Sequence, residues 1–134
     1  MKYQYSYRVI YGDTDQAGMV YHANYLRFFE AARTELVRSA GYAYKNLETK
    51  HGIMLPVVEV FLRFKAPVYY DEVINIQVWL EEVKPFRLKF RYEVYKDEIL
   101  AAVGYTLHVP VNKEGKIVRF PERVYKLLKE LEGD

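Results

Sequence analysis

The chain has 134 residues, enough for one domain with its own core. Apolar residues make up 51% and charged residues 28%, which excludes disorder and collagen. The absence of cysteine excludes disulfide frameworks and thiolate sites, and 20 basic against 18 acidic residues predict neither nucleic acid nor an anionic membrane as the main partner. With no signal-peptide core in residues 1–11, we expect a soluble cytoplasmic protein of one domain, residues 1–134, without membrane insertion.

The first third of the chain changes from a strand pattern to a helix pattern. Aromatic side chains at alternate positions predict a strand from Tyr3 to Val9, and a turn-rich segment covers residues 12–18. From about His22 the apolar spacing predicts a helix of about seventeen residues and about 25 Å, with Gly41 at its left-handed end. Its apolar stripe consists of Tyr25, Phe28, Phe29, Ala32, Leu36 and Ala40.

The second half alternates as strands do. The predicted strands are Val57–Lys65, Asp71–Val83, Phe86–Tyr95 and Ile99–Val109. The connections between the last three are too short to cross a sheet, so these strands form antiparallel hairpins. In the last strand we expect the inward side chains to be Val103, Tyr105, Leu107 and Val109.

The order of elements predicts an α+β fold. A short helix begins at Pro121 and ends the chain. One long antiparallel five-stranded sheet has an apolar face to cover, and one long apolar helix is available to cover it. We therefore expect the sheet to curl around a single central helix.

The candidate chemistry lies just before that helix. The segment 11–25 places Asp13 and Asp15, with Gly12 and Gly18, ahead of the helix N-terminus. The unpaired N–H groups and the dipole of a helix N-terminus attract negative charge, including the oxyanion of a reacting carbonyl. A carboxylate beside such donors fits acyl transfer, because one group attacks or activates water while the others stabilise the carbonyl oxygen.

Simpler readings compete with this one. An Asp before a helix commonly serves only as a cap or an Asx-turn. A calcium loop needs a ligand where Ala17 stands, and Ser6 and Ser39 lie outside any nucleophile turn, so we expect neither a metal nor a serine hydrolase. Among the histidines, His51 in a loop and His108 on the less apolar strand face are expected at the surface, whereas His22 starts the helix.

The run GDTDQAGMVYHANYLRFFEAART resembles the signature of the 4-hydroxybenzoyl-CoA thioesterase family of hotdog-fold enzymes, in particular its Tol-Pal-associated acyl-CoA thioesterase branch. The run FLRFKAPVYYDEVINI and the closing strands follow the same family order, so the similarity covers nearly the whole chain. The resemblance implies a hotdog fold and an acyl-CoA thioesterase. We expect no cofactor.

The same resemblance implies roles for individual residues. Asp15 is the catalytic carboxylate, either as a nucleophile through an anhydride or as a base for water. The backbone N–H of His22 polarises the thioester carbonyl, and its imidazole adds a hydrogen bond. Asp13 orders the turn, and Tyr21 and Asn24 shape the substrate pocket and the helix start.

The resemblance further implies a homodimer whose sheets join edge to edge, with active sites built from both chains, and dimers that pair into a homotetramer. Lys84 and Arg87 match the positions where the family contacts the phosphates of coenzyme A. Lys89 and Arg91 continue that face. Alternatively, Arg87, Lys89 and Arg91 are only a solvated strand face.

We therefore expect an enzyme that hydrolyses acyl-CoA to free acid and coenzyme A. Two other functions fit the same fold: a non-catalytic acyl-CoA or acyl-carrier binding module, and a hydratase of acyl thioesters that uses a His base. Asp15 within the full string favours hydrolysis, since a hydratase would place its acid and its histidine on different segments. Acyl chain length depends on the pocket shape, which the sequence pattern does not determine.

Overall fold

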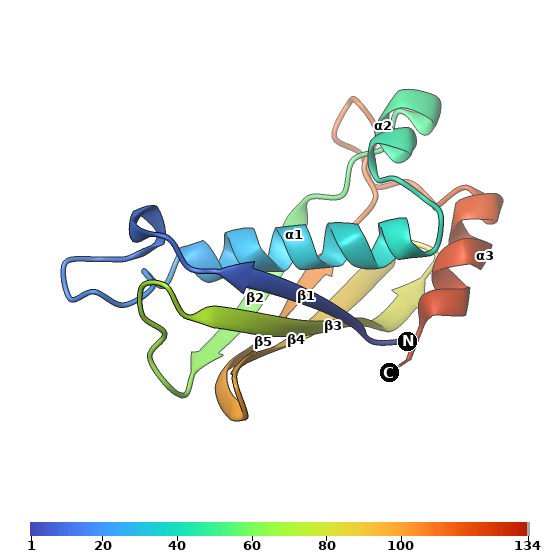
Figure 1. Ribbon diagram of the computed structural model, residues 1–134. Helices are drawn as coiled ribbons and strands as arrows, with labels where there is room; N and C mark the ends of the chain where they lie inside the picture. The colour runs from blue at the N-terminus through green and yellow to red at the C-terminus, as the bar shows by residue number, and fades with distance from the viewer. Residues whose placement is uncertain (134) are drawn as a thin grey trace.

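The computed structural model describes residues 1–133 and confirms the α+β class (Figure 1). Its elements follow the predicted order, with two short helical additions, η1 and α2. They are β1 (Tyr3–Arg8), the 3-10 turn η1 (Tyr11–Asp13), α1 (Asn24–Ser39), α2 (Lys45–His51), β2 (Val57–Phe64), β3 (Val73–Lys84), β4 (Arg87–Lys96), β5 (Ile99–His108) and α3 (Glu122–Leu131). No helix in this range is both long and apolar enough to cross a bilayer.

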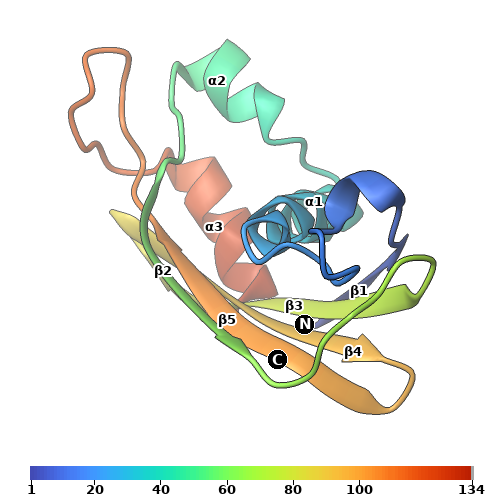
Figure 2. The ribbon, with the colours of Figure 1, turned by 90° about the vertical axis from the view of Figure 1, so that its left-hand side faces the viewer.

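The five strands form one sheet in the order β1-β3-β4-β5-β2. All neighbouring strands are antiparallel, which confirms the predicted hairpins between β3, β4 and β5. Seen along α1, the sheet curves around one side of that helix (Figure 2). This is the hotdog arrangement, and it leaves β1 and β2 as the two edges.

Helix α1 fills the concave side of the sheet. Its predicted stripe is buried at Tyr25, Phe28, Phe29, Ala32 and Leu36. The Phe29 ring stacks on the Tyr92 ring of β4, with the ring centroids 4.0 Å apart and an angle of 5° between the ring planes. The helix begins at Asn24, and Gly41 after its end has the expected left-handed φ of +87°.

The prediction for the faces of β5 is wrong. The buried side chains there are those of Ala101, Ala102, Thr106 and His108, the last three on the same face as Gly104. Val103, Tyr105 and Leu107 are only partly buried. The cause is the close approach of β2 and α1, because a Cβ at Gly104 would lie 2.5 Å from the Phe61 carbonyl oxygen and 3.1 Å from Cε2 of Phe29. A small residue must therefore face inward there, and the period of two carries Thr106 and His108 to the same face.

His108 is consequently not a surface residue, in contrast to the expectation from sequence. It is 1% exposed, with Nδ1 3.1 Å from the Leu55 carbonyl and Nε2 2.8 Å from the Thr106 hydroxyl. Burial, helped by the charge of Arg33, lowers the pKa of His108 to about 4. His51 is exposed as expected but ends α2 and does not lie in a loop.

Candidate active site

Asp13 anchors the turn that precedes α1. Its carboxylate is 1% exposed, and Oδ2 accepts hydrogen bonds from the Tyr7 hydroxyl at 2.8 Å and the Ile10 N–H at 2.9 Å. Arg27 adds a longer ion pair at 3.8 Å to Oδ1. With both of its oxygens facing protein groups, Asp13 orders the turn, as expected.

The carbonyl of Asp13 ties the turn to the helix start. It accepts the Tyr21 N–H at 2.8 Å and the Nδ2 amide of Asn24 at 2.8 Å. Asn24 therefore fixes the beginning of α1, which is one of the two roles expected for it. Its side chain does not line the pocket described below.

Asp15 sits in a second, tighter turn. Its Oδ1 accepts the Ala17 N–H at 2.9 Å, and its backbone carbonyl accepts the Gly18 N–H at 3.0 Å. Gly18 has a φ of +83°, which only glycine adopts without strain. Asp15 itself is exposed, and among residues 1–133 its second oxygen, Oδ2, has no hydrogen-bond partner.

The beginning of α1 presents free N–H donors. Within the described part of the chain, the backbone N–H groups of His22 and Ala23 have no hydrogen-bond acceptor. The positive end of the helix dipole lies at the same place. A carbonyl oxygen that gains negative charge would be stabilised here.

Asp15 and His22 meet in one pocket of about 430 Å³. Tyr25 and Phe64 line it too, with their ring centroids 5.2 Å apart and an angle of 65° between the ring planes. Burial raises the pKa of Tyr25 to about 12, so its hydroxyl is neutral. The whole lining is Asp15, Met19, Val20, His22, Tyr25, Phe64, Lys65, Ala66, Pro67 and Val68.

The wall formed by residues 64–68 was missed at the level of sequence. It reaches the turn through a hydrogen bond from the Val20 N–H to the Val68 carbonyl at 2.7 Å. Lys65 brings the one Lys or Arg side chain among these lining residues. The run FKAPV, residues 64–68, was the signal available in the sequence.

Tyr21 lies beside the pocket and does not line it. Its ring is 45% exposed and contacts the His22 ring at a centroid distance of 4.4 Å. Its backbone, held by Asp13, positions the helix start. No three His, Cys, Asp or Glu side chains within residues 1–133 gather closely enough to hold a metal ion.

The structure does not bring Lys84 and Arg87 to Asp15 within one chain. They pair across the β3–β4 turn, at one end of β3. Val73, at the other end, pairs with Arg8, which lies close in the chain to the turn with Asp13 and Asp15. Arg87 forms an ion pair with Glu82. Lys89 and Arg91 both pair with Glu81, as the side chains of a solvated strand face do.

Comparison with known proteins agrees with this architecture. Residues 9–128 match the model of the thioesterase-like superfamily. The acyl-CoA thioesterase YbgC of Haemophilus influenzae is 29% identical over 91% of this chain and 90% of its own.

Two solved structures superpose closely. A hypothetical protein from Thermus thermophilus has a TM-score of 0.93 at 35% identity over all of both chains. A DHNA-CoA thioesterase from Staphylococcus aureus has a TM-score of 0.91 at 25% identity, covering 96% of this chain and 89% of that one. Because the superfamily model spans most of the sequence, the chain belongs to the thioesterase-like superfamily.

Proposed function

We propose that the protein hydrolyses the thioester of acyl-CoA and releases a free acid and coenzyme A. The observation that carries this proposal is that Asp15 and His22, whose backbone N–H is free, line one pocket, with the free N–H of Ala23 next in the chain. The names of two relatives support it, since YbgC and the DHNA-CoA enzyme are both thioesterases of CoA esters.

Asp15 has two routes to the same products. As a nucleophile, its Oδ2 attacks the thioester carbon, the C–S bond breaks, the thiolate of coenzyme A leaves, and water then hydrolyses the mixed anhydride. As a base, Asp15 removes a proton from the water that attacks the same carbon. The Ala17 N–H holds Oδ1 and leaves Oδ2 available for either role.

The N–H groups of His22 and Ala23 receive the carbonyl oxygen as it gains charge. One such donor is typically worth about 2.7–4 kcal/mol of transition-state stabilisation. The imidazole of His22 lines the same pocket and supplies a further donor to that oxygen.

The test is the release of free thiol from a panel of acyl-CoAs by the wild type and by Asp15→Asn. We expect Asp15→Asn to lose at least 1,000-fold in kcat while its affinity for substrate stays within a few-fold, since the amide keeps the shape and loses the charge. Asp97→Asn, in the exposed β4–β5 turn, is the matched control and keeps full activity. Equal rates for Asp15→Asn and wild type would remove Asp15 from this role, and binding without any thiol release would favour a binding module.

We further propose a homodimer formed through the β2 edges, with dimers pairing into a homotetramer. Support comes from apolar side chains that β2 exposes outside the pockets, Val58 and Phe61. Unpaired edge strands of this kind are usually covered.

This dimer would also give Lys84 and Arg87 a route to the substrate. A two-fold axis between antiparallel β2 strands turns the partner around, so the partner's β3–β4 turn would lie at the same end of the joined sheet as Asp15. Their contact with coenzyme A phosphates is therefore proposed across subunits. The cytoplasmic location and the Tol-Pal branch stay predictions.

A further inference from the structure

Two more cavities lie along α1, farther from its N-terminus than the pocket of Asp15. The first has a volume of about 200 Å³ and the second about 420 Å³, and Glu30 and Arg33 line both. We call this row of three hollows the α1–β2 groove; it is bordered by Leu26, Glu30 and Arg33 of α1 and by Val57, Val60 and Phe64 of β2.

The strand register gives the direction of the groove. Phe64, at the catalytic pocket, pairs with Ala102, whereas Val60 pairs with Thr106 and Val57 with His108. Thr106 and His108 line the successive cavities, so they lie on the floor of the groove and away from its catalytic end. Along α1, the eleven positions from His22 to Arg33 span about 17 Å.

The middle of the groove is apolar and accessible. Leu26, Val57 and Val60 are 39%, 41% and 42% exposed, which is unusual for side chains that line one continuous hollow. Apolar side chains left open in a groove mark a binding surface for an apolar ligand.

Its far end is polar, and a chain of hydrogen bonds leads to it. The Leu55 carbonyl can only accept, so Nδ1 of His108 carries the proton and Nε2 accepts from the Thr106 hydroxyl. The Tyr92 hydroxyl then donates to Thr106 Oγ1 at 2.7 Å, and Arg33 Nη1 donates to Tyr92 at 3.4 Å. The guanidinium of Arg33 is thus held at the end of a satisfied buried chain.

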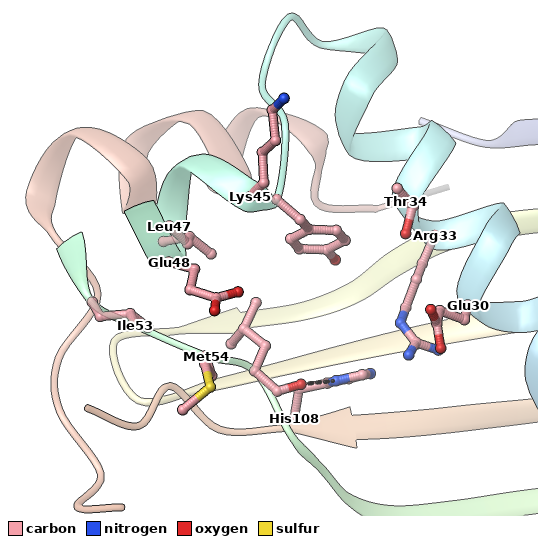
Figure 3. Close-up of a pocket in the computed structure, with 11 residues that line it drawn as sticks. Glu30, Arg33, Thr34, Lys45, Leu47, Glu48, Ile53, Met54 and His108 are labelled. Atoms are coloured by element: carbon pink, nitrogen blue, oxygen red, sulfur yellow. Dashed lines mark hydrogen bonds between the residues drawn. The ribbon is translucent and has the colours of Figure 1, made fainter. Parts of the chain in front are cut away.

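Most of the N–H donors of Arg33 are free. Of its five N–H groups one is used, and within residues 1–133 no carboxylate oxygen lies within 4.0 Å of its nitrogens. Figure 3 shows Arg33 and Glu30 extending from α1 into the cavity above His108, with Lys45 and Glu48 on the side of α2. Glu30, Lys45 and Glu48 are exposed to water, which weakens their influence, whereas Arg33 is partly buried.

We propose that the α1–β2 groove holds the acyl chain of the substrate and that Arg33 binds a carboxylate at the far end of that chain. The favoured substrates are then CoA thioesters of dicarboxylic acids long enough to span the groove. A planar guanidinium binds a carboxylate through two parallel hydrogen bonds, which gives both affinity and orientation. This inference rests on the proposed thioesterase function, since it assigns the thioester end to the pocket of Asp15.

The first test uses the wild-type protein and matched pairs of substrates. Hexanoyl-, decanoyl- and tetradecanoyl-CoA are compared with adipoyl-, sebacoyl- and tetradecanedioyl-CoA, and kcat/KM is measured by thiol release. For the longer pairs we expect the carboxylate to raise kcat/KM about tenfold to a hundredfold, and for the six-carbon pair we expect no gain, because a short chain does not reach Arg33. Equal values for all pairs, or a preference for methyl ends, would overturn the inference.

The second test assigns the preference to Arg33. Arg33→Met should remove the preference for a carboxylate, so that kcat/KM for sebacoyl-CoA falls to the value for decanoyl-CoA in the same variant. Arg33→Lys should keep part of it. Arg38→Met, which alters an exposed arginine of α1 paired with Glu35, should keep all of it. A preference that survives in Arg33→Met, or an equal loss on both substrates, would exclude Arg33 as the binding residue.

The two proposals can fail separately. Thiol release without a carboxylate preference would contradict only the groove assignment. If no acyl-CoA is hydrolysed, the thioesterase proposal fails, and calorimetric binding of sebacoyl- against decanoyl-CoA still decides whether the groove recognises a carboxylate. If Arg33→Met does not fold, as judged by circular dichroism, Arg33→Lys and the wild-type series decide.

Discussion

Gly104 of β5 and Phe29 of α1 lie in direct contact at the centre of the core. A methyl group at Gly104 would lie 3.1 Å from Cε2 of Phe29 and 2.5 Å from the Phe61 carbonyl oxygen of β2. The contact lets α1 pack close to the sheet. The distance between helix and sheet in turn determines where the helix N-terminus lies relative to the turn that carries Asp15. Packing at one glycine is therefore linked to the geometry of the candidate active site.

Gly104→Ala should be destabilising. The added Cβ forces either the helix or the β2 backbone to move, and overpacking of this kind costs about 1–3 kcal/mol. Urea unfolding followed by circular dichroism measures the change. Gly12→Ala is the control, since its Cβ would have only an ordinary contact at 3.9 Å, and it should change the free energy of unfolding by less than about 0.5 kcal/mol. Equal effects of the two changes would contradict this account.

Asp13→Ala should weaken both stability and activity. It leaves the Tyr7 hydroxyl and the Ile10 N–H without their acceptor, a loss of about 2–3 kcal/mol in the free energy of unfolding. Because the turn also positions Asp15, we expect kcat to fall at least tenfold at a temperature where the variant stays folded. Tyr7→Phe removes only one of the donors and should cost about 1 kcal/mol. A fully active, fully stable Asp13→Ala protein would show that this anchor is dispensable.

His108 should make the protein acid-sensitive. Its pKa is about 4 in the folded state, against an ordinary value of 6.5, so between these values the unfolded chain takes up a proton that the folded chain refuses. Its stabilising contribution is complete above pH 6.5 and is lost as the pH falls through about 4, by about 3 kcal/mol in all.

His108→Gln tests this dependence, because the amide still has a donor and an acceptor but does not titrate. The difference in unfolding free energy between wild type and variant should shrink as the pH is lowered from 7.5 to 4.5, and taking this difference cancels the titration of the carboxylates. The exposed His51→Gln should show no such trend. A difference that is constant with pH would mean that His108 is not neutral in the folded protein.

Val58→Lys tests the proposed edge-to-edge dimer. Val58 is 54% exposed on β2, and a lysine on an edge strand opposes pairing with a second strand. We expect association at least tenfold weaker than in the wild type by light scattering after gel filtration. Ile117→Lys, which alters a 57% exposed residue outside β2, is the control. A wild-type protein that is monomeric, or a Val58→Lys protein that assembles as the wild type does, would contradict the proposal.

Alternation of apolar and polar residues predicts which face of a strand is buried only where the buried side chains are the more apolar ones. In β4 the inward residues Leu88, Phe90, Tyr92 and Val94 are buried, as expected. In β5 the rule fails, because the Phe61 carbonyl and the Phe29 ring leave no room for a Cβ at Gly104 and hydrogen bonds satisfy Thr106 and His108. The seven residues of α2, KNLETKH, bury only Leu47 and carry too little apolar pattern to be detected.

The sequence predicted one wall of the candidate site, the segment with Asp15 and His22, but not the opposite wall. Asp15 and His22 belong to one continuous segment, so local turn and helix signals place them near each other. The opposite wall, Phe64 to Val68, comes from a distant part of the chain and reaches the site through tertiary pairing with Val20. Local patterns contain no information about such pairing.

The double hydrogen bond at the Asp13 carbonyl has a consequence for dynamics. Since the Tyr21 N–H and the Asn24 amide both donate to the Asp13 carbonyl oxygen, we expect the turn that carries Asp13 and the first turn of α1 to move together. Substrate then meets a turn and a helix start whose relative position is fixed before binding.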